Sequence, residues 1–227
     1  ANQGAIAIAK TLEVNAVLKL LDLSRNTIKA KGATAIAKAL EVNAVLKFLN
    51  VDGAELPIKQ LKGTEPVETL DLSYKDLGLL SGIVIAKLIE FNAVLTSLSL
   101  ADNNLANYGE DMSGVIAIAD ALKSGTAVMK SLNLEHNNLG KEGGMAMVEA
   151  LKLNVVLTKV DVSYNSLDEE SALRIVRAIK PHNKMTSLGL ACCKIRPTGA
   201  EEIAEYVKFS AVLVRWVFAR LKRPSTH

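Results

Sequence analysis

The feature that most constrains this chain is a long phrase that occurs twice at a fixed offset. The segment GAIAIAKTLEVNAVLKLLDL starts at Gly4 and returns as GATAIAKALEVNAVLKFLNV at Gly32, which is 28 residues later. More divergent copies of the same phrase follow through the rest of the sequence. Self-similarity at a fixed period is the signature of repeat architectures, in which each unit stacks on the next. We therefore expect one elongated array rather than two separate globular domains.

Each copy joins a helical pattern to a strand pattern. Apolar residues spaced like Ile36, Ala37 and Leu40 predict a helix with one buried face. An eleven-residue segment follows in which apolar residues alternate, as at Leu21 and Leu23, and this alternation predicts a short strand. A unit of about 28 residues cannot bury both apolar faces alone, so neighbouring copies must cover them.

The eleven-residue segment has the form L-x-x-L-x-L-x-x-N-x-L. Its copies begin at Leu18, Leu46, Val67, Leu95, Met129, Leu157 and Met185, with a worn copy at Leu213. The spacings between successive starts are 28, 21, 28, 34, 28, 28 and 28 residues. The ninth position is asparagine in four copies, namely Asn26, Asn103, Asn137 and Asn165. A buried amide there can pair with backbone groups of adjacent turns, so we interpret this asparagine ladder as structural.

These segments and the glycine-opened helices resemble the ribonuclease-inhibitor class of leucine-rich repeats, over essentially the whole chain. Proteins of this kind include the ribonuclease inhibitor, the sensing domains of nucleotide-binding immune receptors and the activators of the small GTPase Ran. The resemblance implies an α/β solenoid, or horseshoe, with one parallel β-sheet on the concave side and α-helices on the convex side. We expect a single domain over residues 1–227. It would contain a partial helix over 4–17, about seven full repeats from Leu18 and a degenerate capping repeat over 213–227.

Two copies depart from the common length. The second has 21 residues and carries Pro57 and Pro66 where its neighbours carry a helix, which predicts a short extended or single-turn segment. The fourth has 34 residues, with the extra length around ANYGEDMSG, and is either a solvated insertion or a contact loop. The asparagine ladder is also interrupted, because Ala54, Lys75 and Cys193 take the ladder position in the second, third and seventh copies.

Neither end of the array has an evident polar cap. The first helix copies the second so closely that we expect either upstream repeats or a neighbouring chain at this open edge. At the other end Trp216 and Phe218 are predicted to fill the last layer. A basic patch follows, which is either a solvated cap or a contact for an acidic partner, and it consists of Arg215, Arg220, Lys222 and Arg223.

The outward strand positions form the predicted binding surface. Five residues of its two central columns are acidic and none is basic, which disfavours phosphate backbones and favours a protein with basic or polar groups. Tyrosine and arginine, which are enriched at binding hot spots, flank these columns, and Phe48 adds an apolar corner. The predicted partner-binding residues are Asp22, Arg25, Phe48, Asp52, Asp71, Tyr74, Glu135, His136, Asp161 and Tyr164.

The sequence offers no constellation for catalysis. The three histidines are scattered, no phosphate-binding loop occurs, and Asp168 with its two acidic neighbours stands where a helix should begin. The adjacent Cys192 and Cys193 have neither disulfide nor metal-ligand spacing. The net charge of +3 and the absence of long basic runs give no reason to expect nucleic acid.

We therefore predict a non-catalytic protein–protein interaction scaffold without cofactor or metal. No leader or membrane span is evident, so we expect an intracellular, cytoplasmic protein. Two alternatives stay open. One is a structural subunit held in a large assembly through its uncapped ends, and the other is a regulatory partner of a small GTPase.

Overall fold

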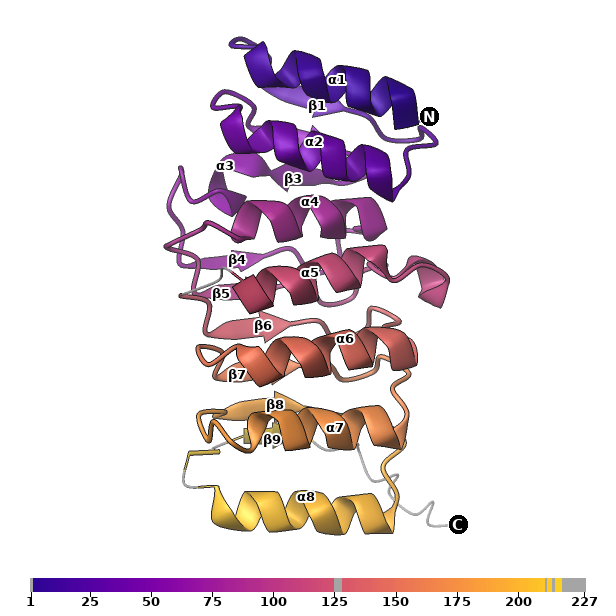
Figure 1. The fold of residues 1–227 in the computed structure, drawn as a ribbon, viewed down its shortest axis with the longest axis vertical. Helices are drawn as coiled ribbons and strands as arrows, with labels where there is room; N and C mark the ends of the chain where they lie inside the picture. Colours follow the sequence, from indigo (N-terminus) through magenta and orange to yellow (C-terminus); the bar gives the residue numbers. More distant parts are fainter. Residues whose placement is uncertain (1, 125–127, 211, 214, 218–227) are drawn as a thin grey trace, which may run out of the picture.

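The computed structural model describes residues 2–124, 128–210, 212, 213 and 215–217. Helices and strands alternate along the chain and stack in one direction, so that the molecule is an elongated solenoid (Figure 1). The long helices cover one side, the helix face. They are α1 (Asn2–Val14), α2 (Ala30–Val42), α4 (Leu79–Ile89), α5 (Ser113–Ser124), α6 (Gly140–Leu153), α7 (Glu169–Ile179) and α8 (Pro197–Phe209).

The predicted strands form on the opposite side, the strand face. They are β1 (Leu20–Asp22), β2 (Phe48–Asn50), β4 (Thr69–Asp71), β5 (Ser97–Ser99), β6 (Ser131–Asn133), β7 (Lys159–Asp161), β8 (Ser187–Gly189) and β9 (Arg215–Val217). Strands β4 to β9 pair in parallel, with equivalent residues of successive repeats side by side, as Leu98 is beside Leu132. The alternating leucines point into a continuous apolar core shared with the helices. The predicted α/β leucine-rich-repeat solenoid is confirmed.

One detail of the sheet differs from the prediction, because the strands form two sheets rather than one. Strand β3 (Glu55–Pro57) turns back beside β2 in antiparallel direction and closes a sheet of order β1-β2-β3. The other six strands form the second sheet, β4 to β9. The reversal occurs at Gly53, whose φ of 116° is open to glycine but strained for other residues.

The short second repeat explains this reversal. After β3 only the four-residue helix α3 (Ile58–Leu61) follows, which confirms the expected single-turn segment. Pro57 lacks an N–H, and it lies on the edge strand of its sheet, where no further strand needs that donor. Since α3 is too short to occupy a full layer, α2 packs directly against α4.

Two charged side chains span the junction between the sheets. The Nζ of Lys62 donates to the carbonyl oxygens of Leu40 and Asn43, at 2.7 and 2.8 Å, and so caps the end of α2. The carboxylate of Asp52 accepts from the N–H of Ser81 at 2.6 Å, in the first turn of α4. These contacts bind helix ends of neighbouring layers where a complete repeat is missing.

The asparagine ladder forms as expected in the second sheet. The Nδ2 of Asn137 donates to the carbonyl of Leu100 at 2.7 Å, one repeat earlier. The Oδ1 of Asn165 accepts from the N–H of Asn137 at 2.7 Å. Cys193, which replaces asparagine in the seventh copy, places its thiol 3.6 Å from the carbonyl of Ala191. Each ladder residue therefore pairs backbone groups that the turns would otherwise leave unsatisfied.

A second row of asparagines lies at the opposite end of the strands, and the sequence analysis did not single it out. Asn43 donates from Nδ2 to the carbonyl of Leu12 at 2.7 Å and accepts at Oδ1 from the N–H of Leu46 at 2.8 Å. Asn92 and Asn154 make equivalent bonds in later repeats. The repeats that carry both asparagines, Asn92 with Asn103 and Asn154 with Asn165, are thus joined to the preceding repeat at both ends of the strand.

The two ends differ in how far they are described. At the first, Val14 and Val17 are strongly exposed, and the edge of β1 has no neighbouring strand among the described residues. The predicted cover for this edge stays a prediction. At the other end Arg215 belongs to β9 and is exposed. The predicted aromatic plug and most of the basic patch lie outside the described residues or side chains, namely Trp216, Phe218, Arg220, Lys222 and Arg223.

Candidate protein-binding surface

A single backbone geometry positions the side chains that follow each strand. Two residues after the last inward leucine of the segment, the backbone adopts a left-handed conformation. These residues, here named the turn column, are Arg25, Tyr74, Asp102, His136, Tyr164 and Cys192, with φ between 51° and 56°. Such a conformation costs a non-glycine residue roughly 1–2 kcal/mol.

Hydrogen bonds to the next repeat hold four residues of the turn column in this conformation. The N–H of Tyr74 donates to the carbonyl of Ala101 at 3.1 Å, and that of Tyr164 donates to Ala191 at 2.8 Å. Asp102 and His136 bond in the same way. Because the backbone is fixed by the neighbouring layer, the side chains of the column are presented in a regular series along one edge of the strand face.

The aromatic members of the turn column meet one another or a carboxylate. The rings of His136 and Tyr164 are stacked, with centroids 4.5 Å apart and planes 8° from parallel. Tyr74 is 77% exposed, and a hydrogen bond to Asp102 raises the pKa of its hydroxyl. The three aromatic residues are among the residues predicted from the sequence, whereas Asp102, which occupies the same column one repeat after Tyr74, is not.

Carboxylates of the strands lie beside these rings. Asp71 accepts hydrogen bonds from the hydroxyl and the N–H of Ser73, which lower the pKa of its carboxyl. Glu135 is half-buried; desolvation, followed by the neighbouring charge of Asp161, raises the pKa of Glu135. A Cβ at Gly189 would collide with the carboxylate of Asp161, so the glycine in the next strand leaves the space that this carboxylate occupies.

These residues form one connected surface on β4 to β7 and the turns that follow. We name it the acidic–aromatic strip, and it consists of Asp71, Tyr74, Asp102, Glu135, His136, Asp161 and Tyr164. Its four carboxylates are accompanied by two exposed cations, Lys159 in the outward column of β7 and Lys75, whose charge acts on Asp71. The strip therefore combines a local negative charge with accessible aromatic faces.

The remaining predicted residues lie on the first sheet and are separate from the strip. Phe48 is 40% exposed and pairs in register with Leu20, so the predicted apolar corner is present. Asp22 is exposed and accepts a hydrogen bond from the N–H of Ser24 at 2.8 Å. Arg25 is exposed at the first position of the turn column.

Asp52 is oriented differently from the expectation. It was placed in an outward column of the strand face, whereas the structure directs its half-buried carboxylate to the N–H groups at the start of α4. Desolvation by this burial raises the pKa of Asp52 despite those hydrogen bonds. The early reversal of the chain after β2 accounts for the change, because the residues that follow the strand no longer run along the ladder.

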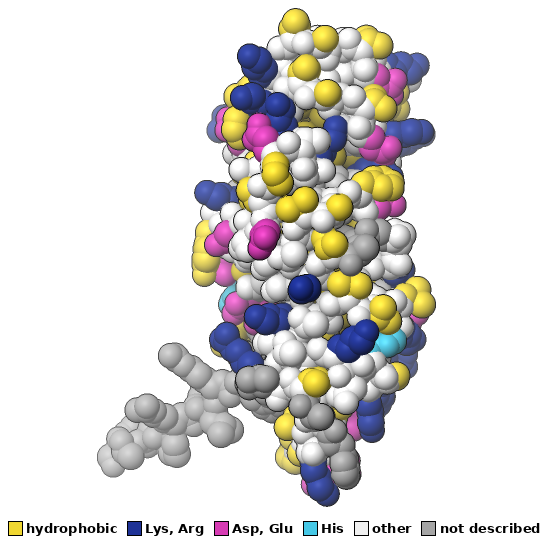
Figure 2. Space-filling view, turned by 90° about the vertical axis from the view of Figure 1, so that its left-hand side faces the viewer, with side chains coloured by type: hydrophobic (Ala, Val, Ile, Leu, Met, Phe, Trp, Pro, Cys, Tyr) yellow, Lys and Arg dark blue, Asp and Glu magenta, His cyan; other side chains and the backbone are white. Residues whose placement is uncertain are grey.

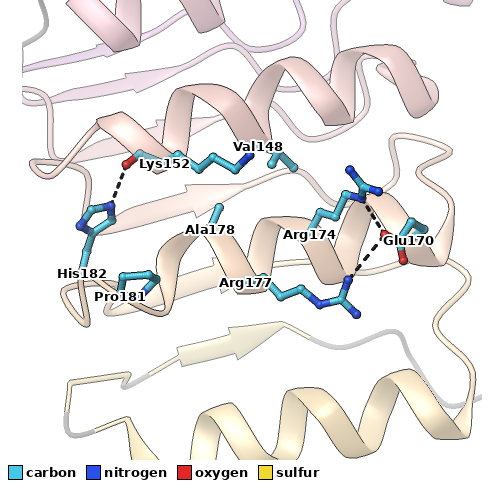
Figure 3. A pocket seen from close by; sticks show the side chains of 8 residues that line it. All are labelled: Val148, Lys152, Glu170, Arg174, Arg177, Ala178, Pro181 and His182. Carbon is cyan, nitrogen blue, oxygen red and sulfur yellow. Dashed lines mark hydrogen bonds and ion pairs between the residues drawn. The ribbon is translucent and has the colours of Figure 1, made fainter.

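Other surfaces of the molecule have a simpler explanation. Between α6 and α7 a pocket of about 480 Å³ opens on the helix face, above Val148 and Ala178 (Figure 3). Its charged groups are paired within the fold, since Arg174 bonds to Glu170 at 2.6 Å and Arg177 bonds to Glu202 at 2.7 Å. We interpret this pocket as the groove between two neighbouring helices.

Figure 2 shows the flank at which the helices end and the strands begin. Hydrophobic side chains occur along it in small groups separated by polar and backbone atoms (Figure 2). Exposed apolar residues at the helix ends are Val14, Val42, Phe91 and Leu153. Scattered exposed apolar residues are common on folded proteins, so they indicate no partner by themselves.

The chemistry of metal sites and thiols gives no competing site. In the described part of the chain, no group of three or more His, Cys, Asp or Glu residues is arranged to hold a metal ion. Burial raises the pKa of the Cys193 thiol to about 12, which keeps it protonated and unreactive at neutral pH. Asp168 accepts from the N–H of Ser171 at 2.9 Å, which confirms the expected helix cap. None of the described helices is long and apolar enough to cross a membrane.

The fold and the surface together define a class of protein, a solenoid of strand-and-helix repeats that displays side chains from successive turns. Comparison with protein families gives the same answer. A family model described as a leucine-rich repeat matches residues 14–37, 127–148 and 182–204. The chain thus contains leucine-rich repeats, and its fold is an α/β leucine-rich-repeat solenoid of the ribonuclease-inhibitor-like kind.

Solved structures add more distant similarities. The chain is similar to a structure titled leiomodin-1 actin-binding site 2, with 16% identity over 79% of this chain and 87% of that one, and a TM-score of 0.41. It is also similar to the tropomodulin C-terminal domain of Caenorhabditis elegans, with 14% identity over 80% and 92% of the two chains, and a TM-score of 0.41. Similarity at this level identifies no shared partner. Among curated proteins, none matches the sequence.

Proposed function

We propose that the chain is a non-catalytic scaffold that binds a partner protein on its strand face, with a cationic segment of the partner on the acidic–aromatic strip. The observation that carries this proposal is the stacked pair of His136 and Tyr164 beside the half-buried Glu135. The repeat fold requires asparagines and leucines at fixed positions, but it does not require stacked rings or clustered carboxylates on its surface.

The charges of the strip indicate the sign of the charge that a partner should carry. Asp71, Asp102, Glu135 and Asp161 give the strip four carboxylates, and partial desolvation already disfavours the charge of Glu135. A cation placed there relieves the repulsion between Glu135 and Asp161. Aromatic faces such as that of Tyr74 attract guanidinium and ammonium groups, so arginine-containing segments suit the strip best.

The arrangement also suits binding better than catalysis. His136 faces the ring of Tyr164 and not a nucleophile or a substrate cavity. The carboxylates are spread over four successive repeats, a spacing that matches an extended partner better than one reacting group. Tyrosine contributes large contact area at low entropic cost, as binding surfaces use it.

The test uses a fluorescein-labelled peptide in which arginine alternates with serine, measured by fluorescence anisotropy. We expect the triple variant Asp71→Ala, Tyr74→Ala, Tyr164→Ala to bind this peptide at least about tenfold more weakly, which corresponds to about 1.4 kcal/mol. All three side chains lie on the surface, so the thermal unfolding curve should barely change.

Matched controls separate the strip from general surface effects. The double variant Tyr108→Ala, Asp120→Ala removes an exposed tyrosine and an exposed aspartate elsewhere, and it should bind the arginine peptide like the unmodified protein. A peptide with glutamine in place of arginine should bind poorly. Equal binding of both peptides, or an equal loss in both variants, would refute the proposal.

A further inference from the structure

The two repeats of unusual length meet at one place in the molecule. Because the chain reverses at Gly53, the second repeat lacks the loop that connects strand to helix in its neighbours. A groove of about 1030 Å³ lies there, between the loop of the first repeat and those of the third and fourth. Residues 104–111, which contain the extra length of the fourth repeat, supply its far wall. We name this cavity the rim groove.

The wall formed by the first repeat, here called the near wall, is basic. Arg25, Lys29 and Lys31 line it, all three are exposed, and none forms a salt bridge with any residue that the structure describes. The charges of Lys29 and Lys31 are therefore available to a ligand, whereas the charge of Arg25 also acts on the carboxylate of Asp22.

Backbone donors on the same wall are also free. In the third repeat the N–H groups of Lys75 and Leu77 donate to the Oδ1 of Asn103, at 3.1 and 3.0 Å. The equivalent N–H groups of the first repeat belong to Asn26 and Ile28. Since Ala54 occupies the ladder position of the second repeat, they have no hydrogen-bond partner within the described part of the chain. An acceptor from outside can take the place of the missing ladder amide.

Two of the acidic residues that line the groove accept hydrogen bonds from backbone N–H groups of the protein itself. Asp52 accepts from the N–H of Ser81, and Asp111 accepts from the N–H of Ser113 at 2.9 Å. Asp76 is the exposed carboxylate that remains among the lining residues. Over the whole lining the three cations are balanced by three carboxylates, so the attraction for anions belongs to the wall formed by the first repeat, where Arg25, Lys29 and Lys31 lie.

Tyr108 projects from the inserted segment at the edge of the rim groove. It is 78% exposed and belongs to a short 3-10 turn, Asn107–Gly109, in which all three residues have positive φ. The Oδ1 of Asn104 fixes the turn by accepting from the N–H of Tyr108 at 2.6 Å. In Figure 1 the coil before α5 projects from the right-hand edge of the solenoid, the same edge as the N-terminus. The backbone therefore holds an aromatic side chain in solvent beside the groove.

We propose that the rim groove binds an extended acidic segment of a partner protein. Its carboxylates meet Arg25, Lys29 and Lys31, its carbonyl oxygens accept from Asn26 and Ile28, and Tyr108 packs against it. Lining residues come from four repeats, a length that an extended peptide covers better than a single anion. This site lies beyond the acidic–aromatic strip, and it selects the opposite charge.

The experiment measures fluorescence anisotropy of a labelled peptide in which glutamate alternates with serine. The variant Lys29→Glu, Lys31→Glu should weaken binding at least about tenfold, because it replaces attraction by repulsion at two positions. Tyr108→Ala should weaken it by about threefold to tenfold. The control Lys10→Glu, Lys38→Glu makes the same charge change at exposed positions of α1 and α2 outside the groove, and it should bind within about twofold of the unmodified protein.

Several outcomes would overturn the proposal. They are no binding of the glutamate peptide at millimolar concentration, equal binding of its glutamine counterpart, or an equal loss in the control variant. Complete competition by equimolar inorganic phosphate would reduce the groove to a small-anion site. Tighter binding of a single-stranded oligonucleotide would assign it to nucleic acid instead. The Asp71, Tyr74, Tyr164 triple variant should keep its affinity for the glutamate peptide, so failure of either proposal is recognised independently.

Discussion

The two sheets of this solenoid join their repeats by different polar contacts. In the six-stranded sheet, buried amides such as Asn137 and Asn165 pair the backbone of one turn with that of the next. At the end of the three-stranded sheet, Lys62 and Asp52 reach from the periphery to helix ends of the adjoining layers. Where a full helical layer is missing, charged side chains at the surface can connect the neighbouring layers in its place. The rim groove remains open there, in a position that a complete repeat would fill.

The largest expected effect comes from breaking the ladder where it is buried. Asn137→Ala leaves the N–H of Leu105 without its acceptor and removes one of the two amide donors to the carbonyl of Leu100, the other being Asn103. We therefore expect a loss of about 3 kcal/mol in the free energy of unfolding. Asn26→Ala, at the exposed equivalent in the first repeat, should cost less than about 0.5 kcal/mol. Urea unfolding of both variants measures the contrast. Similar losses would mean that the two sheets do not differ in this way.

A smaller effect should come from the close approach of α4 and α5. A Cβ at Gly114 would lie 2.7 Å from the carbonyl oxygen of Leu105 and 2.8 Å from that of Leu79, and backbone atoms cannot move aside easily. Gly114→Ala should therefore destabilise the protein by about 2 kcal/mol. At Gly4 in α1 nothing lies within 4 Å, and Gly4→Ala should stabilise by about 0.5 kcal/mol through helix propensity. Thermal unfolding of the two variants shows whether each substitution raises or lowers the stability. A loss of stability in Gly4→Ala would contradict the open space around Gly4 in α1.

The smallest effect concerns pH and compares two aspartates at helix starts. Hydrogen bonds from Ser171 lower the pKa of Asp168. Its contribution to stability is therefore complete above the pKa of an unfolded aspartate, about 4, and is lost as the pH falls through its lower folded value. Burial raises the pKa of Asp52. The contribution of Asp52 is then complete below about pH 4 and is lost as the pH rises through the raised value.

Urea unfolding between about pH 7 and about pH 3 tests these opposite signs. The cost of Asp168→Ala should shrink on acidification, whereas the cost of Asp52→Ala should grow. If the costs of both substitutions changed in the same direction with pH, the pKa of Asp52 would not be raised by burial.

Most of the fold could be predicted because the same pattern of residues recurs along the sequence and implies the same structural unit at each recurrence. A 28-residue period with alternating leucines permits one kind of stacking, and the 21-residue copy correctly predicted a layer without a full helix. A short extended segment was predicted after Ala54, but the antiparallel pairing of β3 with β2 could not be predicted, because nothing in Glu55, Leu56 and Pro57 specifies the strand on which they pair. The second asparagine row did leave a signal, the phrase NAVL at Asn43 and Asn92, which a search for turn amides could have found.

The site was harder to predict than the fold. Tyr74, His136 and Tyr164 could be placed in one column by counting from the leucines. The same count reaches Asp102, although the sequence prediction did not include it. The contacts between side chains depend on the geometry between repeats, however, so the stacking of His136 on Tyr164 and the hydrogen bond of Tyr74 to Asp102 could not be predicted. Asp52 was misplaced for a related reason, because counting assumes that the chain continues along the ladder after β2.

The left-handed turn has a consequence for how such a chain can change over generations. At Tyr74, Asp102, His136 and Tyr164 the main chain is held by the adjoining layer, so the shape of the turn does not depend on whether tyrosine, aspartate or histidine occupies it. Under the proposed function, a substitution at one of these turns alters which partner is bound without disturbing the architecture. The choice of partner can then change through single substitutions in one repeat, while the residues that specify the fold stay the same.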